Sequence, residues 1–318
     1  MSAPKSPRKG SLQFWPRKRA RKFLPRVNWN AINSGKNLKG FIAYKAGMKS
    51  AIVKDNTEHS MTKGKRIAVP VTILECPNIK IFSVRFYKNG IVKEEVIAEE
   101  SLKDKELKRK IKLPKIIKKK LDKINLNEVD NVSVIVYSQI KKTNLKKTPD
   151  FSEIGIAGNN VNEKINFVKG NINKEISVLD VFEKGDLVDV RGLTTGRGLQ
   201  GPVKRFGITL KSHKAEKGRR NPGSLGPWHP ARVTFRAPQA GQVGMFTRVI
   251  YNNKILDMGK AENKKELKGI KNYGDVKTDY IILRGSIQGP SKRQLVITNT
   301  LRPTREQTKK KFDLLELN

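Results

Sequence analysis

Short apolar runs separated by turn signals dominate the part of the chain that follows residue 39. Two of them, Gly40–Met48 and Lys49–Lys54, are expected to form one hairpin. The next run, Arg66–Leu74, is apolar and β-branched, and Lys80–Tyr87 alternates before the turn pair Asn89-Gly90. Alternation and Asn-Gly turns are typical of antiparallel strands. The pattern therefore predicts an all-β start of barrel or sandwich type.

The same kind of pattern resumes at Ile176 and continues to about residue 300. Strands are expected at Ile176–Phe182, Asp186–Arg191, Val249–Ile255, Thr278–Leu283 and Gln294–Thr298. We predict that 39–90 and 176–300 together form one β core, and that 301–318 is a C-terminal tail. A long basic stretch, 191–251, interrupts the second part of this core.

Residues 91–175 have a different pattern, in which helical and strand stretches mix. Glu99–Lys123 is Lys-rich, and Pro114 divides it into two short stretches that we expect to be helical. Strands are expected at Asn131–Ile140 and Phe151–Ala157, and a helix at Val161–Val168. The mixture predicts an inserted α+β subdomain. One run of lysines has acids nearby and is expected to be a solvated face rather than an RNA site: Lys115, Lys118, Lys119 and Lys120.

The charge balance changes the picture, because the 318 residues include 67 Lys or Arg and only 29 Asp or Glu. The formal net charge is +38 and the isoelectric point is about 10.3. Such an excess destabilises a compact state unless a polyanion neutralises it. Nucleic acid is therefore the favoured partner, ahead of an anionic membrane surface, and an ordinary metabolic enzyme is disfavoured. Since the whole chain is rich in Lys, Asn and Ile, the distribution of the charge matters more than its total.

A single cysteine, Cys76, excludes an internal disulfide framework and any zinc site built on several cysteines. No apolar run reaches the ~18 residues of a membrane span. The N-terminus has no apolar segment of the kind found in signal peptides. We expect a cytoplasmic protein in a reducing compartment, with no metal, no cofactor and no membrane partner.

Residues 1–38 have the composition of an extended basic arm. Nine Lys or Arg lie between Met1 and Arg26 with no acid among them. Four large aromatic residues are interleaved with these cations: Phe14, Trp15, Phe23 and Trp29. Such interleaving suits phosphate pairing together with stacking on RNA bases. The alternative is a solvated basic tail that has no partner.

The stretch 191–251 holds 12 Lys or Arg, 10 glycines and one acid, Glu216. A loop of this length inside a compact domain is usually functional. Its apolar residues are few and scattered, so we expect phosphates rather than a core of its own to order it. In extended form, at about 3.3 Å per residue, it could reach about 40 Å from the β core. We therefore predict that this loop enters RNA.

A glycine motif inside the loop, Gly196–Gly201, matches the G-x-G-x-x-G pattern of dinucleotide sites and follows the apolar stretch Leu187–Val190. Pro202 and Gly207 are expected to break the helix that such a site needs, and no acid follows at a strand end. With Val203 the motif also matches the glycine loop of kinases, but no other kinase motif follows. Close approach of the backbone to RNA phosphates is the favoured role of these glycines.

The three histidines, His59, His213 and His229, have no neighbours at metal-ligand spacing. No G-x-S-x-G motif supports a catalytic triad. RNA contact is therefore the favoured role of His213 and His229, which lie in the basic loop. Trp228 lies between two prolines, and the residues alone leave open whether it plugs a small core within the loop or stacks on a base.

Three blocks of the loop, by their order and spacing, closely resemble the ribosomal protein L3 family of the large subunit. They are Thr195–Gly207 (TGRGLQGPVKRFG), Gly226–Ala231 (GPWHPA) and Gln239–Thr247 (QAGQVGMFT). Arg8–Gly10 with Phe14–Ala20 (FWPRKRA) resembles the N-terminal arm of the archaeal and eukaryotic branch, and Phe41–Lys49 (FIAYKAGMK) resembles its first barrel strands. The resemblance spans nearly the whole chain, with 91–175 loosely matched, and it favours an archaeal-type member.

The resemblance implies a mainly β fold, a six-stranded Greek-key barrel of the translation-protein type, with the insertion, the long loop and the arm attached. It implies a structural protein without catalysis that binds large-subunit rRNA, helps to start subunit assembly and contacts neighbouring ribosomal proteins. No small-molecule substrate and no homo-oligomer are expected. The loop would extend toward the peptidyl-transferase centre and the aminoacyl-tRNA entry path, with Trp228 at its tip.

The residues that we expect to bind rRNA are mostly cations of the arm and the loop. They are Arg8, Lys9, Trp15, Arg17, Lys18, Arg19, Arg21, Lys22, Arg26, Arg197, Lys204, Arg205, Lys211, His213, Lys214, Lys217, Arg219, Arg220, Trp228, His229, Arg232, Arg236, Gln239, Gln242 and Arg248. Two other functions stay open. An RNA-modifying enzyme would need a cofactor pocket or catalytic acid, and a DNA-compacting protein would more often be small or carry its charge on helices.

Overall fold

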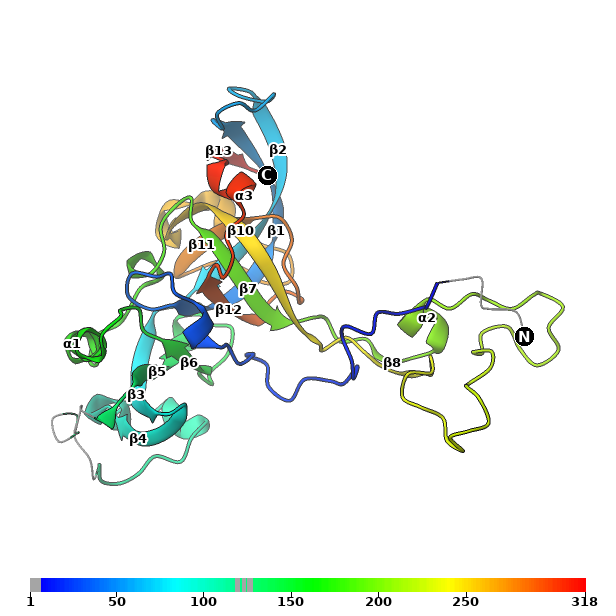
Figure 1. The fold of residues 1–318 in the computed structure, drawn as a ribbon. Coiled ribbons are helices and arrows are strands. Elements are labelled where there is room, and N and C mark those ends of the chain that lie inside the picture. Colours follow the sequence, from blue (N-terminus) through cyan, green and yellow to red (C-terminus); the bar gives the residue numbers. More distant parts are fainter. Residues whose placement is uncertain (1–6, 118–120, 122–123, 125–127) are drawn as a thin grey trace. The chain divides into compact units, whose positions relative to one another are not determined.

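The computed structural model describes residues 7–117, 121, 124 and 128–318 of the chain (Figure 1). The chain divides into two compact units. Met1–Lys22 and Leu193–Arg248 make up the first, called the arm–loop unit below, and Phe23–Gly192 and Val249–Asn318 make up the second, called the sheet unit. Antiparallel strands dominate the sheet unit, which confirms the predicted mainly β class.

Seven strands form the larger sheet. In chain order they are β1 (Gly40–Asp55), β2 (Arg66–Cys76), β7 (Leu187–Leu193), β10 (Thr247–Lys260), β11 (Asp279–Arg284), β12 (Gln294–Asn299) and β13 (Phe312–Leu317). Neighbouring strands follow the order β12-β7-β10-β11-β2-β1-β13. An additional antiparallel pairing between β12 and β1, from Gly40↔Thr298 to Tyr44↔Gln294, joins strands at opposite ends of this order.

The hairpin predicted for Gly40–Lys54 is wrong, because these residues form one continuous strand, β1. Its pairing with β2 shifts register at a β-bulge between Lys45 and Gly47 and then continues regularly through Met48 and Lys49, where the turn was expected. A Cβ atom on Gly47 would lie 2.6 Å from Cγ2 of Ile270, so this glycine permits close packing at the bulge. The strand pairs with β12 near its start and with β13 near its end.

A smaller four-stranded sheet has the order β4-β3-β5-β6. Its strands are β3 (Ile79–Lys88), β4 (Ile91–Ile97), β5 (Asn131–Ser138) and β6 (Phe151–Gly155). The predicted turn at Asn89-Gly90 is confirmed, since both residues have positive φ, 50° and 75°, as a two-residue hairpin turn requires.

The predicted boundary of the insertion at residue 90 differs from the structure. Strand β3 was expected in the larger sheet but pairs with β4 and β5, so the change of sheet falls between Cys76 and Ile79. Pro77 lies at this change, and a proline has no N–H to continue a strand ladder. The smaller sheet therefore begins before the part of the chain that was predicted to form it.

Helices are short. The longest, α1 (Val161–Asn171), confirms the predicted helix, and α2 (Pro202–Phe206) and α3 (Arg305–Lys309) have five residues each. Of the two stretches predicted to be helical, the one before Pro114 contains 3-10 turns at Glu99–Leu102 and Leu107–Arg109, and the one after it lies partly outside the described residues. The predicted lysines Lys118, Lys119 and Lys120 lie outside the described residues. Further 3-10 turns are Trp29–Ala31, Ile140–Thr143, Val178–Asp180, Ala261–Asn263 and Lys265–Leu267.

The strand predicted for Ile176–Phe182 is also wrong, since Val178–Asp180 forms a 3-10 turn. The Ser177 side chain accepts a hydrogen bond from the N–H of Leu179, and the Asp180 side chain accepts one from the N–H of Ser177. This reciprocal capping starts a helical turn in place of a strand. Ile176 itself keeps an isolated antiparallel bridge to Ile79.

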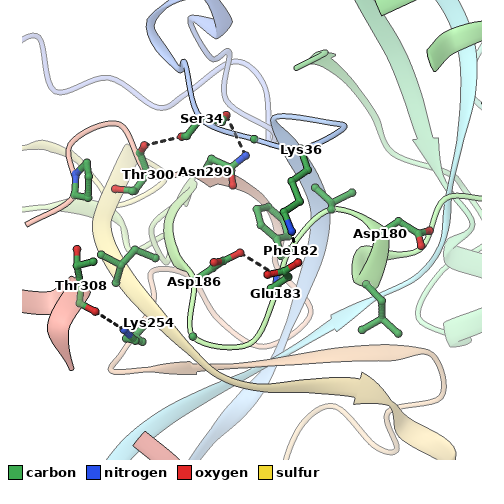
Figure 2. Close-up of a pocket in the computed structure, with 16 residues that line it drawn as sticks. Ser34, Lys36, Asp180, Phe182, Glu183, Asp186, Lys254, Asn299, Thr300 and Thr308 are labelled. Carbon is green, nitrogen blue, oxygen red and sulfur yellow. Dashed lines mark hydrogen bonds and ion pairs between the residues drawn. The ribbon is translucent and has the colours of Figure 1, made fainter. Parts of the chain in front are cut away.

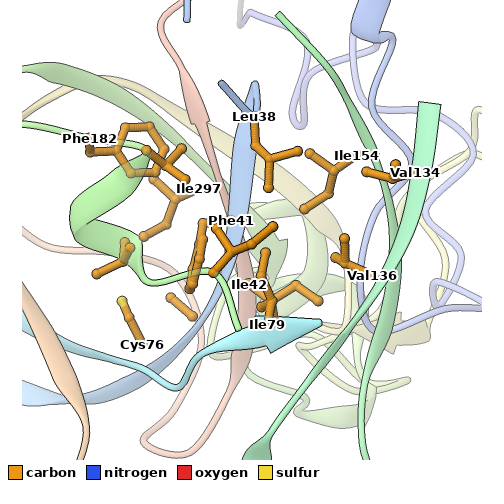
Figure 3. Packing of buried hydrophobic residues seen from close by; sticks show 14 of the residues in the cluster. Leu38, Phe41, Ile42, Cys76, Ile79, Val134, Val136, Ile154, Phe182 and Ile297 are labelled. Carbon is orange, nitrogen blue, oxygen red and sulfur yellow. The ribbon is translucent and has the colours of Figure 1, made fainter. Parts of the chain in front are cut away.

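One hydrophobic core lies between the two sheets (Figure 3). It brings Phe41 and Ile297 of the larger sheet together with Val134, Val136 and Ile154 of the smaller one. The insertion therefore shares its core with the rest of the sheet unit.

Both ends of the chain contribute more to the sheet unit than the sequence predicted. Ile32 and Leu38, expected in the extended arm, are fully buried, and Trp29 packs closely against Gly40. At the other end, the expected tail 301–318 contains α3 and ends in β13, which pairs with β1 (Figure 1). None of the described helices is long and apolar enough to cross a membrane.

Candidate RNA interface

The arm–loop unit concentrates the excess charge. It holds 19 of the 67 Lys and Arg but a single acid, Glu216, in 78 residues. Glu216 forms no ion pair among the described residues, whereas in the sheet unit Arg85 pairs with both Glu95 and Glu153. The cations of the arm–loop unit therefore have no carboxylate of their own unit to neutralise them.

The two limbs of the loop are hydrogen-bonded at their base. Strand β8 (Gly198–Gln200) pairs with β9 (Gly241–Val243) in an antiparallel ribbon. Gly244, with φ of 78°, lies so close to the opposite limb that a Cβ atom there would be 2.0 Å from the carbonyl oxygen of Thr195. This glycine thus allows the limbs to come together at the base of the loop.

The glycine motif Gly196–Gly201 leads into a single helical turn, α2. Pro202 stands at its first position, where a proline is tolerated, and Gly207 ends it in the left-handed conformation. The predicted break thus comes from Gly207 after one turn, rather than from Pro202. Five residues are too short for the helix of a dinucleotide site.

An aromatic cluster joins the arm to the loop. The Trp15 ring stacks on Phe206, with centroids 5.7 Å apart and an interplanar angle of 30°, and its centroid lies 5.6 Å from that of Phe235. Phe206 is only 6% exposed. We expected the loop to have no core of its own; the structure shows that the arm supplies the partner ring for a small one.

Arg205 fastens this cluster. Its guanidinium donates hydrogen bonds to the carbonyl oxygens of Arg17, Gln239, Ala240 and Gln242, at 3.1 to 3.4 Å. Arg17 donates in return to the carbonyl oxygen of Arg205 and lies 4.3 Å from the Phe206 centroid. Burial lowers the pKa of both guanidinium groups, and for Arg17 the nearby Arg205 charge lowers it further. Of these two arginines, both predicted to bind RNA, Arg205 donates to four backbone carbonyl oxygens, whereas Arg17 donates to one and lies against aromatic rings.

Most of the other predicted residues are exposed. They are Arg8, Lys9, Lys18, Arg19, Arg21, Lys22, Arg26, Arg197, Lys204, Lys211, His213, Lys214, Lys217, Arg219, Arg220, Trp228, His229, Arg232, Arg236 and Gln239, whereas Trp15, Arg17, Arg205, Gln242 and Arg248 are half-buried. All of them except Arg26 belong to the arm–loop unit. The structure thus brings nearly all the predicted residues into one unit.

Trp228 is 85% exposed, and no aromatic ring or cation contacts it among the described residues. Of the two roles left open for it, a plug in a small core does not fit this exposure. Arg219 is different, because it donates to the carbonyl oxygen of Lys211 while Lys211 donates its N–H to that of Arg219. These bonds fix a turn that carries the exposed Lys214 and Lys217.

Sequence reasoning missed Phe235 of this unit as a site candidate, and it counted Phe14 among the interleaved aromatics of the arm without including it in the list of expected binding residues. The guanidinium carbon of Arg248 lies 4.3 Å from the centroid of the Phe14 ring. Phe235 is 69% exposed and contacts Trp15. For Phe235 the signal was its neighbour Arg236, since an aromatic next to a cation in a basic loop is typical of RNA contacts.

The sheet unit has a cavity of about 420 Å³ between the segments 34–36, 179–187 and 299–308 (Figure 2). Its charged groups are satisfied locally: Lys36 pairs with Glu183, and Asp186 accepts the N–H of Glu183. Lys254 donates to the carbonyl oxygens of Gln307 and Thr308 at the end of α3, and burial lowers its pKa. Across the part of the chain that the structure describes, no three His, Cys, Asp or Glu are grouped to hold a metal.

Comparison with known proteins shows which family the chain belongs to. The family model "Ribosomal protein L3" matches residues 1–316. Similar proteins include large ribosomal subunit protein uL3 of Methanocaldococcus jannaschii, 39% identical over 307 residues that cover 93% of this chain and 92% of that protein. The uL3 proteins of Methanococcus vannielii and Nanoarchaeum equitans are each 38% identical, covering 98% and 96% of this chain and 95% and 94% of their own. The chain therefore belongs to the ribosomal protein L3 family.

Proposed function

We propose that this protein is a structural constituent of the large ribosomal subunit and binds its rRNA mainly through the arm–loop unit. The observation that carries the proposal is the charge of that unit: 19 Lys or Arg against one acid, with the acid unpaired among the described residues. Phosphates are the natural counter-charges for exposed cations at this density. The relatives, which are named as large-subunit proteins, support the same assignment.

Within the unit we propose two classes of residue. The exposed cations pair with phosphates; Lys204, Lys214, Lys217, Arg220 and Arg232 are examples. Arg17 and Arg205 instead hold the arm against both limbs of the loop, because their guanidinium groups donate hydrogen bonds to backbone carbonyl oxygens. Affinity then comes from phosphate contacts, and specificity from RNA shape and a few stacked bases.

For the fold we propose a six-stranded Greek-key barrel of the translation-protein type. Strands β7, β10 and β11 are successive neighbours, and β12 returns to lie beside β7. That order is the Greek-key arrangement of four antiparallel strands. The pairing of β12 with β1 supports closure of β1, β2, β11, β10, β7 and β12 into a ring.

We further propose that the loop extends toward the peptidyl-transferase centre and the aminoacyl-tRNA entry path, with Trp228 at its tip, and that the protein joins the subunit early in assembly. The exposure of Trp228 supports a tip that meets RNA. The role is structural, so the protein positions RNA and takes part in no bond-making step.

Cosedimentation with ribosomal subunits at moderate salt tests the proposal. The full chain should be recovered with the large subunit, at one copy per particle. Recovery with duplex DNA in preference to subunits would favour a DNA-compacting protein, and recovery with free precursor rRNA alone would favour an RNA-modifying enzyme.

A further inference from the structure

Three aromatic rings of the arm–loop unit are in contact and differ in their exposure. Trp15 contacts both Phe206, which is 6% exposed, and Phe235, which is 69% exposed. The Trp15 ring stacks on Phe206 with centroids 5.7 Å apart, whereas Phe235 is tilted by 56° against it with centroids 5.6 Å apart, and both distances are typical of aromatic contacts. The Phe235 ring thus has a ring partner on the Trp15 side, and most of the rest of its surface is open.

The open ring is held in place. The Arg8 guanidinium donates a hydrogen bond of 2.7 Å to the carbonyl oxygen of Arg236, the residue next to Phe235. Trp15 donates from its indole Nε1 to the carbonyl oxygen of Ser11 at 2.6 Å. Together with the hydrogen bonds between Arg17 and Arg205, these contacts fix the two chain segments that hold the three rings. Phe235 is therefore preorganised, which lowers the entropy cost of binding a ligand on it.

The charged groups around these three rings indicate which class of ligand the rings can bind. The Arg8 guanidinium carbon lies 6.0 Å from the Trp15 centroid, and that of Arg236 lies 6.0 Å from the Phe235 centroid. A flat apolar face with guanidinium groups beside it matches a nucleotide, whose base stacks on the ring while its phosphate meets the cation. A purely apolar protein partner would leave those charges without a counterpart.

We propose that Phe235, backed by Trp15 and flanked by Arg8 and Arg236, is a stacking site for one unpaired RNA base. The inference rests on the proposed rRNA binding and names the ligand of one particular site within it. The site is separate from Trp228, which has no ring or cation beside it among the described residues. A paired base cannot use the site, because its faces are already stacked within the helix.

The test measures binding of the full chain to an eight-residue oligouridylate and to an RNA hairpin of equal phosphate number over a salt series. Phe235→Ala should weaken oligouridylate binding by about 5- to 150-fold, the range for loss of one stacked base. The slope of log K against log salt should not change, since no phosphate contact is lost. Binding to the paired stem should be unaffected.

Matched variants separate stacking from apolar contact and from charge. Phe235→Trp should keep the affinity and Phe235→Leu should lose most of it, because only the first has a π-face. Leu199→Ala, at a residue that is 78% exposed in the same unit, should have no effect. Arg236→Gln should instead reduce the magnitude of the slope for oligouridylate by about 0.7.

Several results would overturn the site. The base-stacking role would be wrong if the Phe235→Ala variant bound oligouridylate as tightly as the wild type. It would also be wrong if the substitution reduced the affinity for the hairpin as much as the affinity for oligouridylate. Variants that bind RNA normally but fail to enter subunits would assign Phe235 to a protein partner. Wild-type protein that binds neither RNA would instead contradict the proposed function itself, so the two failures are distinguishable. Far-UV circular dichroism of each variant checks that it is folded.

Discussion

The arm–loop unit and the sheet unit treat their charged groups in opposite ways. In the sheet unit, Lys45 is buried and donates to the carbonyl oxygens of Ile287 and Gly289, and Arg85 lies between two carboxylates. In the arm–loop unit the internal partners are carbonyl oxygens and aromatic rings, as at Arg205 and Arg17. The first unit neutralises much of its charge internally, whereas the second needs an external polyanion.

This difference predicts which substitutions change the stability of the protein and which change its RNA binding. The buried acids of the sheet unit are surrounded by donors: Asp189 accepts hydrogen bonds from the N–H groups of Asn252 and Leu301 and from the Thr300 hydroxyl. Substitutions at such groups should act on folding, while substitutions of exposed cations in the arm–loop unit should act on RNA binding. The predictions below set these two kinds of effect against each other.

The largest effect should come from salt. If about ten cations of the arm–loop unit meet phosphates, log K for large-subunit rRNA should fall with log salt at a slope of roughly −7 to −9. Between 50 and 200 mM salt these slopes correspond to a loss of about 10⁴- to 10⁵-fold in affinity. Filter binding over a salt series measures the slope. A slope near −2 would show that phosphate contacts do not dominate, and the comparison of the two units would lose its basis.

Reversing the charge of Lys217, Arg219 and Arg220 to Glu should reduce the magnitude of that slope by about 2 to 3 and impair entry into subunits. The matched variant is Trp228→Ala, which removes at most ~1–3 kcal/mol of stacking. It should still enter subunits, yet alter peptide-bond formation or drug sensitivity through the displaced tip. The measurements are the subunit occupancy and the rate of peptide-bond formation for both variants. The roles of tip and flank would be reversed if Trp228→Ala abolished incorporation while the triple variant assembled normally.

Within the sheet unit, Glu75→Ala should lower the free energy of unfolding by about 3 kcal/mol or more, because the buried Tyr273 hydroxyl and two backbone N–H groups lose their acceptor. Glu75 is fully buried and accepts hydrogen bonds from the Tyr273 hydroxyl and from the N–H groups of Lys277 and Thr278. Urea denaturation measures the change. Glu58→Ala, at an exposed ion pair with Lys311, should cost at most about 1 kcal/mol. RNA affinity of folded Glu75→Ala should match the wild type.

Local sequence pattern predicted most strands of the sheet unit but not its strand boundaries. Short apolar runs located β2, β3, β5, β6, β7, β10, β11 and β12, and the Asn89-Gly90 turn followed directly from its residue types. The hairpin predicted within β1 was wrong because the strand continues after the register shift between Lys45 and Gly47. The 3-10 turn after Ser177 was missed although Ser177 and Asp180 have the spacing of a capping pair.

The candidate interface was predictable in composition and unpredictable in its internal contacts. Counting charges located the arm and the loop, and the structure places nearly all the chosen residues in one unit. Trp15 and Phe206 are 191 positions apart, and no periodicity links residues at that separation. The division of labour between Arg205, which holds backbone carbonyls, and its exposed neighbour Lys204 likewise depends on tertiary contacts.

The smallest effect should come from acid titration of the sheet unit at Glu175. Partial burial acts to raise the pKa of this carboxyl, but hydrogen bonds from Lys142, Asn78 and Gln139 outweigh it and lower the pKa to about 2. A carboxyl whose pKa is lower in the folded state stabilises the protein above its unfolded pKa of about 4.3, and that stability is lost as the pH falls toward 2.

Glu175→Gln should therefore be less stable than the wild type by at most about 1 kcal/mol at pH 7, since the group is partly exposed, and the difference should vanish near pH 2. Urea denaturation from pH 7 to 2 measures it. The control Glu316→Gln replaces an exposed side chain to which no described residue donates, so at pH 7 it should change the free energy of unfolding by less than Glu175→Gln does. A difference between Glu175→Gln and the wild type that stays the same from pH 7 to 2 would mean that these three hydrogen bonds do not favour the charged form.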